Sequence, residues 1–166
     1  MKEDGSKTGE TGDFTHLDAA GQARMVNVGG KETTVRRAVA RGRVVMAPAT
    51  AQAVAQQSLA KGDVLAVARI AGIQAAKRTS EAVPLCHPLM LSSVEVDCTV
   101  TANSVDIEAR VEVVGRTGVE MEALHACTVA ALTVYDMCKA IDKDMVISDV
   151  ALWEKTGGRS GSYRRV

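Results

Sequence analysis

The segment from Glu120 to Lys139 constrains the fold more than any other part of the chain. It is rich in Ala, Leu, Met and Val, it contains neither Gly nor Pro, and it has no Asp, Glu, Lys or Arg between Ala123 and Tyr135. A helix that is apolar nearly all round is typically buried between other elements. The sequence therefore predicts a long core helix over this segment.

Two charged residues follow at the end of this apolar segment. Asp136 and Lys139 are three residues apart, so a helix places both side chains on one face. Charges on a core-like helix are costly unless they are paired or face a polar cavity. A carboxylate and an amine held together at the edge of a core are also what proton transfer requires. We therefore expect a functional site at this end of the helix.

Strict alternation of apolar and polar residues over 94–100 and 105–113 predicts an antiparallel hairpin with one buried and one solvated face. Further patterns predict strands over 34–46 and 145–153 and helices over 49–59 and 64–78. This order of elements predicts an α+β fold, with the helices packed on one face of an antiparallel sheet. The sequence divides into a disordered segment over 1–13, a single domain over 14–155 and a flexible, Gly-rich basic tail over 156–166.

Composition narrows the classes of function. The formal net charge is zero and only 2% of residues are aromatic, which argues against a nucleic-acid binder. No apolar run approaches the length of a membrane span and the first residues lack the apolar core of a secretion signal, so we expect a cytoplasmic protein that does not contact membranes. Small apolar residues supply most of the core, which favours burial of part of the surface in an oligomer.

His87 has the most constrained backbone of the candidate residues. It lies between Pro84 and Pro88, and such a stiff mounting suits an imidazole that must keep one geometry; a turn histidine satisfied by the backbone is an equal alternative. Cys86 is a possible thiolate nucleophile, but adjacent residues of an extended chain point to opposite faces, which disfavours a Cys86–His87 pair. The other cysteines, at positions 98, 127 and 138, are expected to be small core residues.

The remaining candidates are charged residues beside breaks in the pattern. Glu122 lies in the first turn of the long helix, where either the positive helix end stabilises a functional carboxylate or the residue is an ordinary surface charge. The fingerprints of the common nucleotide-phosphate loops are absent. Basic side chains next to breaks or apolar elements could together hold a phosphate: Lys61, Lys77, Arg78, Lys139, Lys155 and Arg159.

Several blocks of this sequence, in this order, resemble the MoaC family over about residues 14–161. The blocks are Lys61-Gly62-Asp63-Val64, Ala68-Arg69-Ile70-Ala71-Gly72-Ile73-Gln74-Ala75-Ala76-Lys77-Arg78-Thr79, Pro84-Leu85-Cys86-His87-Pro88-Leu89, Gly118-Val119-Glu120-Met121-Glu122-Ala123-Leu124 and Tyr135-Asp136-Met137-Cys138-Lys139-Ala140. The resemblance implies a ferredoxin-like α+β fold and a homohexamer, built as a trimer of dimers with active sites at the dimer interface.

The resemblance also implies a reaction and its residues. The family converts a cyclised guanosine triphosphate to a tricyclic pyranopterin with a cyclic phosphate, releasing pyrophosphate, in molybdenum cofactor biosynthesis. The implied catalytic residues are Asp136, Lys139 and Lys61. The implied substrate-binding residues are Leu85, Cys86, His87, Met121, Glu122, Lys77 and Arg78. The resemblance implies no metal ligand, and Mg²⁺ accompanying the triphosphate is the one cofactor candidate.

The family usually has Ser-Gly-Gly-Lys-Ser-Gly in the tail, where this chain has Arg159 in place of the lysine, so the charge is kept but not the geometry. We expect Asp136 and Lys139 to move protons during ring opening and closure. We expect Lys61, Lys77 and Arg78 to stabilise the phosphate charge, while His87 and Glu122 orient the purine-derived part. Two rival functions remain: a non-catalytic nucleotide-binding or scaffold protein, and a hydrolase that uses the Cys86 thiol.

Overall fold

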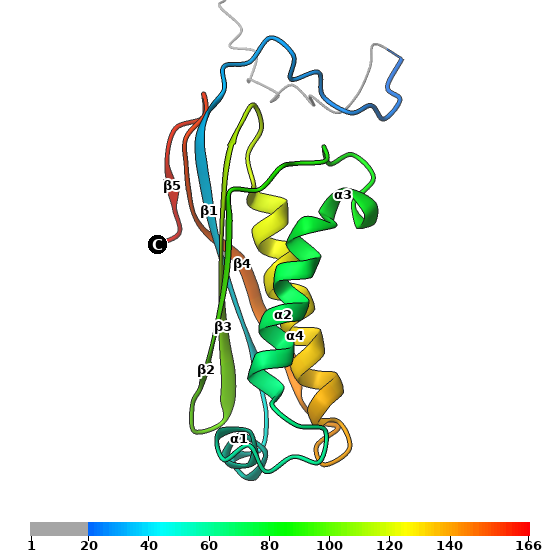
Figure 1. Ribbon diagram of the computed structural model, residues 1–166, viewed down its shortest axis with the longest axis vertical. Coiled ribbons are helices and arrows are strands. Elements are labelled where there is room, and N and C mark those ends of the chain that lie inside the picture. Colours follow the sequence, from blue (N-terminus) through cyan, green and yellow to red (C-terminus); the bar gives the residue numbers. More distant parts are fainter. Residues whose placement is uncertain (1–19) are drawn as a thin grey trace, which may run out of the picture.

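A computed structural model describes residues 20–166, so the prediction for residues 1–13 lies outside the described part. Five antiparallel strands form one sheet in the order β2-β3-β1-β4-β5. The strands are β1 (Thr34–Val45), β2 (Ser93–Val100), β3 (Ser104–Gly115), β4 (Val146–Thr156) and β5 (Tyr163–Arg164). Figure 1 shows the sheet as one layer and the long helices as a second layer on one of its faces. The expected α+β, ferredoxin-like architecture is confirmed.

Two long helices, α2 (Val64–Lys77) and α4 (Glu120–Cys138), form most of the second layer. Two short helices, α1 (Pro48–Ala55) and α3 (Thr79–Ala82), lie at opposite ends of the molecule. Helix α4 packs against β1, β3 and β4 as well as against α2, so it occupies the centre of the domain. The core helix that the apolar segment predicts is therefore confirmed. No helix of the described residues is long and apolar enough to cross a bilayer.

The sheet has one covered face and one open face. Along β1 and β3 the residues that point to the helices are buried and small or branched, while most of those between them are charged. This follows from the two-residue period of a strand, which gives each face its own set of side chains. The open face carries arginines and carboxylates that pair across neighbouring strands, such as Arg37 with Glu112 and Arg41 with Glu108.

The structure differs from the expected boundaries at several element ends, most clearly at the end of α1 and after β4, where β5 lies within the segment expected to be a flexible tail. The helix expected over 49–59 ends at Ala55, because Gln57 has a positive φ of 52°, which a continuing helix does not allow. The chain after β4 turns through Gly157 and Gly158, both at positive φ, and returns as β5 to pair with the edge of β4. This return places residues 155–160 near the beginning of β1.

Candidate active site

The first candidate group is the lysine–aspartate cluster, formed by Asp136, Lys139 and Lys61. The Asp136 Oδ1 atom lies 2.7 Å from Lys139 Nζ, and its Oδ2 atom lies 3.1 Å from Lys61 Nζ. Lys61 Nζ also donates to the backbone oxygen of Asp136 at 2.7 Å. One carboxylate therefore lies between two ammonium groups, and residues distant in sequence meet at this point.

Local structure explains how Lys61 reaches the end of α4. The chain turns at Gly62, whose φ is +94°, a conformation that favours glycine. Asp63 then caps α2 by accepting a hydrogen bond from the Ala66 amide at 3.0 Å. This turn holds Lys61 beside the last turn of α4, which carries Asp136 and Lys139.

Pairing sets the charge states of this cluster. Hydrogen bonds from Lys139 and then Lys61 hold the pKa of the Asp136 carboxyl below its usual value. The bond to Asp136 raises the pKa of Lys139 above its usual value. All three side chains are substantially exposed, with 56% of the Asp136 side chain accessible. At neutral pH the cluster thus presents one proton acceptor between two proton donors, accessible to a ligand.

The second candidate group is the Glu122 pocket, a hollow of about 390 Å³ beside the beginning of α4. It brings together five of the residues that the resemblance implied as substrate-binding. These are Leu85, Cys86, His87, Met121 and Glu122. Lys31, Thr117, Gly118 and Glu120 also line it, with apolar side chains from Val26, Val28, Val83 and Leu89.

Glu122 is not the surface charge that its position in the first helical turn favoured. Only 4% of the residue is exposed, and burial raises the pKa of its carboxyl to about 7. A carboxyl group with a pKa near neutrality can serve as either a proton donor or a proton acceptor. Burial and the nearby Glu122 charge also raise the pKa of the Cys86 thiol, so it stays protonated and is a poor nucleophile.

The sequence disfavoured a Cys86–His87 catalytic pair because adjacent residues of an extended chain point to opposite faces. Both residues nevertheless line the Glu122 pocket. The segment is not fully extended. It turns at Pro84 and Leu85, with the Cys86 amide donating to the Val83 oxygen at 3.0 Å. Alternation holds only for a regular strand, and this turn removes it.

The two groups lie at opposite ends of α4. Glu122 and Asp136 are fourteen residues apart on this helix, which corresponds to about 21 Å along its axis. Lys77 and Arg78 end α2 near the beginning of α4, where Thr79 Oγ1 lies 3.2 Å from His125 Nδ1. They are exposed and are not among the residues lining the Glu122 pocket. One chain therefore brings most of the expected residues together as two groups rather than one, and Lys77 and Arg78 belong to neither group.

A third hollow adjoins the Glu122 pocket and contains residues that sequence reasoning missed. We call it the basic hollow; it measures about 850 Å³ and shares Lys31, Thr117, Gly118 and Glu120 with that pocket. Its cationic side chains are Lys31, Arg36, Arg37, Arg116, Lys155 and Arg159. Lys155 and Arg159 were candidates from the sequence. Of the cationic residues that sequence reasoning missed, Lys31 and Arg116 each directly follow a glycine, and a turn at that glycine was the one signal the sequence offered for them.

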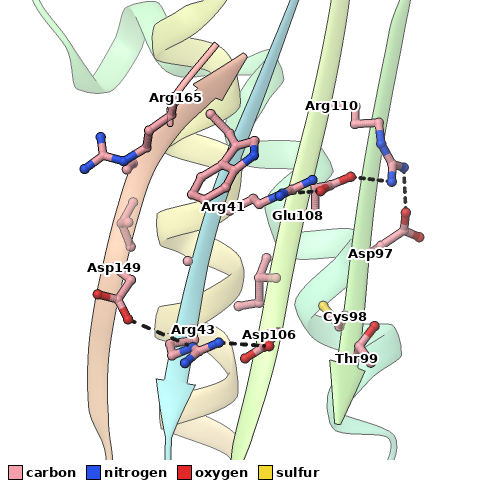
Figure 2. Close-up of a pocket in the computed structure, with 15 residues that line it drawn as sticks. Arg41, Arg43, Asp97, Cys98, Thr99, Asp106, Glu108, Arg110, Asp149 and Arg165 are labelled. Carbon is pink, nitrogen blue, oxygen red and sulfur yellow. Dashed lines mark hydrogen bonds and ion pairs between the residues drawn. The ribbon is translucent and has the colours of Figure 1, made fainter. Parts of the chain in front are cut away.

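The open face of the sheet holds a further hollow, of about 960 Å³. Figure 2 shows that Arg41, Arg43 and Arg110 point to carboxylates, whereas Arg165 does not. Arg43 lies between Asp106 and Asp149, and Arg110 contacts Asp97 at 2.6 Å. Arg41 lies over the ring of Trp153, 4.6 Å from its centre. This hollow contains none of the site residues expected from the sequence.

Three features of this α+β domain together define a class of protein. They are an exposed carboxylate between two lysines, a buried carboxyl of near-neutral pKa and a basic hollow. It is an enzyme that carries out acid–base chemistry on a small anionic molecule. Residues 25–158 match the MoaC family. The chain belongs to this family.

Relatives in several bacteria show the same similarity over nearly the whole chain. The cyclic pyranopterin monophosphate synthase of Chloroflexus aggregans is 58% identical over 160 residues, which cover 95% of this chain and 97% of the relative. The synthase of Thermomicrobium roseum is 62% identical, covering 92% and 93%. The synthase of Heliobacterium modesticaldum is 60% identical, covering 92% and 97%. The resemblance carried by the sequence blocks is therefore confirmed.

Proposed function

We propose that the lysine–aspartate cluster and the Glu122 pocket together form the active site of a cyclic pyranopterin monophosphate synthase. The chain is an enzyme of molybdenum cofactor biosynthesis, a lyase whose substrate is the cyclised derivative of guanosine triphosphate. The observation that carries the assignment of residues is the Asp136 carboxylate held between two ammonium groups at the end of the core helix. The assignment of individual residues is our proposal.

The lysine–aspartate cluster suits the proton transfers of this reaction. Ring opening and closure require protons to be added to and removed from nitrogen and oxygen. Asp136, kept ionised by its partners, accepts a proton, and Lys139, kept charged by Asp136, donates one. Lys61 fixes the orientation of the carboxylate and supplies a second positive charge beside the reacting group.

The Glu122 pocket suits the purine-derived part of the substrate. Its apolar wall, with Leu85 and Met121, can cover a flat ring, while His87 and Glu122 offer hydrogen bonds at its edge. In the phosphate step a sugar hydroxyl forms a bond to the α-phosphorus. The bond from that phosphorus to the bridging oxygen breaks, pyrophosphate leaves with the electron pair, and the hydroxyl proton passes to a carboxylate of the site.

Lys77 and Arg78 remain proposed substrate-binding residues. They are exposed at the end of α2, on the same side of the molecule as the beginning of α4, and can approach a substrate that extends out of the Glu122 pocket. Among residues 20–166 no group of three His, Cys, Asp or Glu side chains is placed to hold a metal ion. Mg²⁺ brought with the triphosphate stays the cofactor candidate.

We also propose that the complete site forms between two subunits of a homohexamer. The two groups on one chain are about 21 Å apart along α4, which is too far for one small substrate to contact both. A two-fold axis that crosses α4 near its middle would place the end of one α4 beside the beginning of another. This arrangement agrees with the dimer-interface sites that the family resemblance implies.

Incubation with the cyclised guanosine triphosphate tests this function. We expect release of pyrophosphate together with formation of the pterin product, both measured by chromatography. Binding of the compound without product would favour a non-catalytic nucleotide-binding protein. Phosphate hydrolysis without pterin, abolished by selective alkylation of Cys86, would favour the thiol hydrolase.

A further inference from the structure

Asp142 lies in the turn that follows α4, and its carboxylate contacts a helix from a distant part of the chain. Its Oδ2 atom accepts hydrogen bonds from the Ala47 amide at 2.9 Å and from the Thr50 hydroxyl at 3.0 Å. Both donors lie at the beginning of α1, 92–95 residues earlier in the sequence. Asp142 is therefore a side-chain link between the end of α4 and the beginning of α1.

This link gives α1 a cap that its own sequence does not contain. The residue before the helix, Ala47, has no side-chain oxygen, and the first turn of α1 has no acidic residue. The Asp142 carboxylate takes the place of both, and it also satisfies the hydroxyl of Thr50, a residue only 3% exposed. Hydrogen bonds from the Ala47 amide and then from Thr50 hold the pKa of the Asp142 carboxyl below its usual value. Asp142 is therefore ionised at neutral pH.

The segment between α1 and Lys61 is fixed to the helices on both sides of it. The Ser58 amide donates to the Ala53 oxygen of α1 at 3.1 Å. The Gln57 side chain donates at 3.3 Å to the carboxylate of Asp63, the cap of α2. Because these bonds hold the segment close to α1, the position of Lys61 depends on the position of α1.

The turn that carries Lys139 is also held by hydrogen bonds. Lys139 caps the end of α4, three residues before Asp142. The Asp142 amide donates to the Cys138 oxygen at 3.2 Å, and the Tyr135 hydroxyl donates to the Lys143 oxygen at 3.1 Å. The Asp142 carboxylate is thus attached through a short, bonded turn to the residue that supplies one ammonium group of the cluster.

Cys138 shows that the Asp142 link and the Lys61–Asp136 contact lie close together. Burial raises the pKa of the Cys138 thiol, the Asp142 carboxylate raises it further and the Lys61 ammonium lowers it. The contact between Lys61 and Asp136 joins two exposed side chains, and such pairs hold a geometry weakly. The Asp142 link joins a carboxylate to a backbone amide and a buried hydroxyl, so it is the more rigid of the two.

We propose that Asp142 is a positioning residue for the lysine–aspartate cluster. It holds the segment that carries Lys61 against the turn that carries Lys139, so that both ammonium groups meet the Asp136 carboxylate. This inference rests on the proposed function, because it takes the cluster to be catalytic. A displacement of a catalytic group by about 1 Å can lower a rate about 10²-fold, so a link of this kind has a measurable effect on turnover.

Steady-state kinetics tests this role. Asp142→Ala removes the acceptor for both donors, so we expect kcat for pterin formation to fall about ten- to hundredfold. KM should stay within about threefold, because the Glu122 pocket lies at the other end of α4. Asp142→Asn keeps one oxygen for the Ala47 amide and the Thr50 hydroxyl, and it should restore kcat to within about threefold of wild type. A purely structural role would lower the melting temperature without lowering kcat at temperatures well below it.

The pKa of Asp136, followed by the NMR signal of its carboxyl carbon, tests the geometry without any reaction. In the wild-type protein Lys139 and Lys61 hold this pKa below its usual value. Asp142→Ala should raise it toward that value, because less well-placed ammonium groups stabilise the carboxylate less. Loss of the Asp142 charge alone would lower it, so a rise identifies lost positioning.

Thr50→Val supplies a milder test if Asp142→Ala does not fold. It keeps the shape of the buried side chain and removes one of the two donors to Asp142. We expect kcat to fall about two- to fivefold, and the pKa of Asp136 to rise by less than in Asp142→Ala.

Asp106→Ala is the matched control, because it also removes a carboxylate that accepts two hydrogen bonds, but on the open face of the sheet. It should change neither kcat nor the pKa of Asp136. Wild-type kcat in Asp142→Ala, a fall in kcat with no rise in the Asp136 pKa, or an equal loss in Asp106→Ala would overturn the proposal. A wild-type protein that forms no pterin contradicts the proposed function instead, and the Asp136 titration then still decides whether Asp142 positions the cluster.

Discussion

At the scale of single residues, two opposing effects act on Glu122. The positive end of α4 favours an ionised carboxylate in the first helical turn, typically by less than about 2 kcal/mol. Burial disfavours the ionised form, and it prevails here because only 4% of Glu122 is exposed and its pKa rises to about 7. The position in the helix was visible in the sequence, but the packing of the Glu122 pocket over the residue was not.

This raised pKa predicts how stability depends on pH. The folded protein holds the Glu122 proton more tightly than the unfolded chain, whose carboxyl has a pKa near 4.5. The free energy of unfolding should therefore fall as pH rises from about 4.5 to about 7, by roughly 2–4 kcal/mol from this residue. Glu122→Gln should lose this component, so urea denaturation of both proteins between pH 4.5 and 8 measures it. Parallel curves for the two proteins would contradict the prediction.

A second residue-scale prediction concerns Asp136. Asp136→Asn removes the negative charge and the proton acceptor, so turnover should fall by about 10²–10⁴-fold. The exposed pair contributes little to stability, so the melting temperature should barely change. Asp144→Asn, an exposed aspartate eight residues further along, is the control and should keep wild-type turnover. Wild-type rates in Asp136→Asn would refute the catalytic role of the cluster.

At the scale of secondary structure elements, the crossing of α2 and α4 depends on Gly72. A Cβ atom at this position would lie 2.9 Å from the Ala126 backbone oxygen and 3.1 Å from a Val96 methyl group. A backbone oxygen within a helix cannot move aside as a flexible side chain can. The absence of a side chain at Gly72 is therefore what lets the two helices approach this closely.

Gly72→Ala should consequently destabilise the fold. Alanine is favoured over glycine in a helix by about 1 kcal/mol, whereas overpacking typically costs 1–3 kcal/mol. We expect a net loss of about 1–2 kcal/mol in chemical denaturation. Gly30→Ala is the control, since an added methyl group there meets nothing within 4 Å, and it should be neutral. A Gly72→Ala protein as stable as wild type would show that the helices can shift apart.

Periodicity predicted the elements well where it was regular. The alternation over 94–100 and 105–113 gave β2 and β3 almost to the residue, and the apolar segment gave α4. Periodicity could not place β1 between β3 and β4, because strand order depends on contacts between segments far apart in the sequence. It also missed the turn at Pro84 and Leu85, which brings Cys86 and His87 to one hollow.

At the scale of the whole molecule, the formal net charge of zero conceals an uneven distribution. Arginines and carboxylates balance over the open face, while the basic hollow keeps an excess of positive charge. The composition, averaged over the whole chain, could not reveal this local excess. The cations of the basic hollow come from four separate segments, which only the fold brings together.

The proposed two-subunit site leads to a prediction about mixed oligomers. Asp136→Asn disables the lysine–aspartate cluster and His87→Ala disables the Glu122 pocket, so each variant alone should be nearly inactive. If the two groups meet across an interface, random mixing gives about a quarter of sites with both groups intact. Activity should then return when the two variants are coexpressed, isolated as mixed oligomers through different tags, and assayed for pterin formation.

The control mixes Asp136→Asn with Lys139→Ala, which disable the same cluster and should not complement each other. Because one chain separates the two groups by about 21 Å along α4, a site confined to one subunit would need the substrate to span that length. No recovery in the first mixture, or equal recovery in both, would show that the site is not shared between subunits.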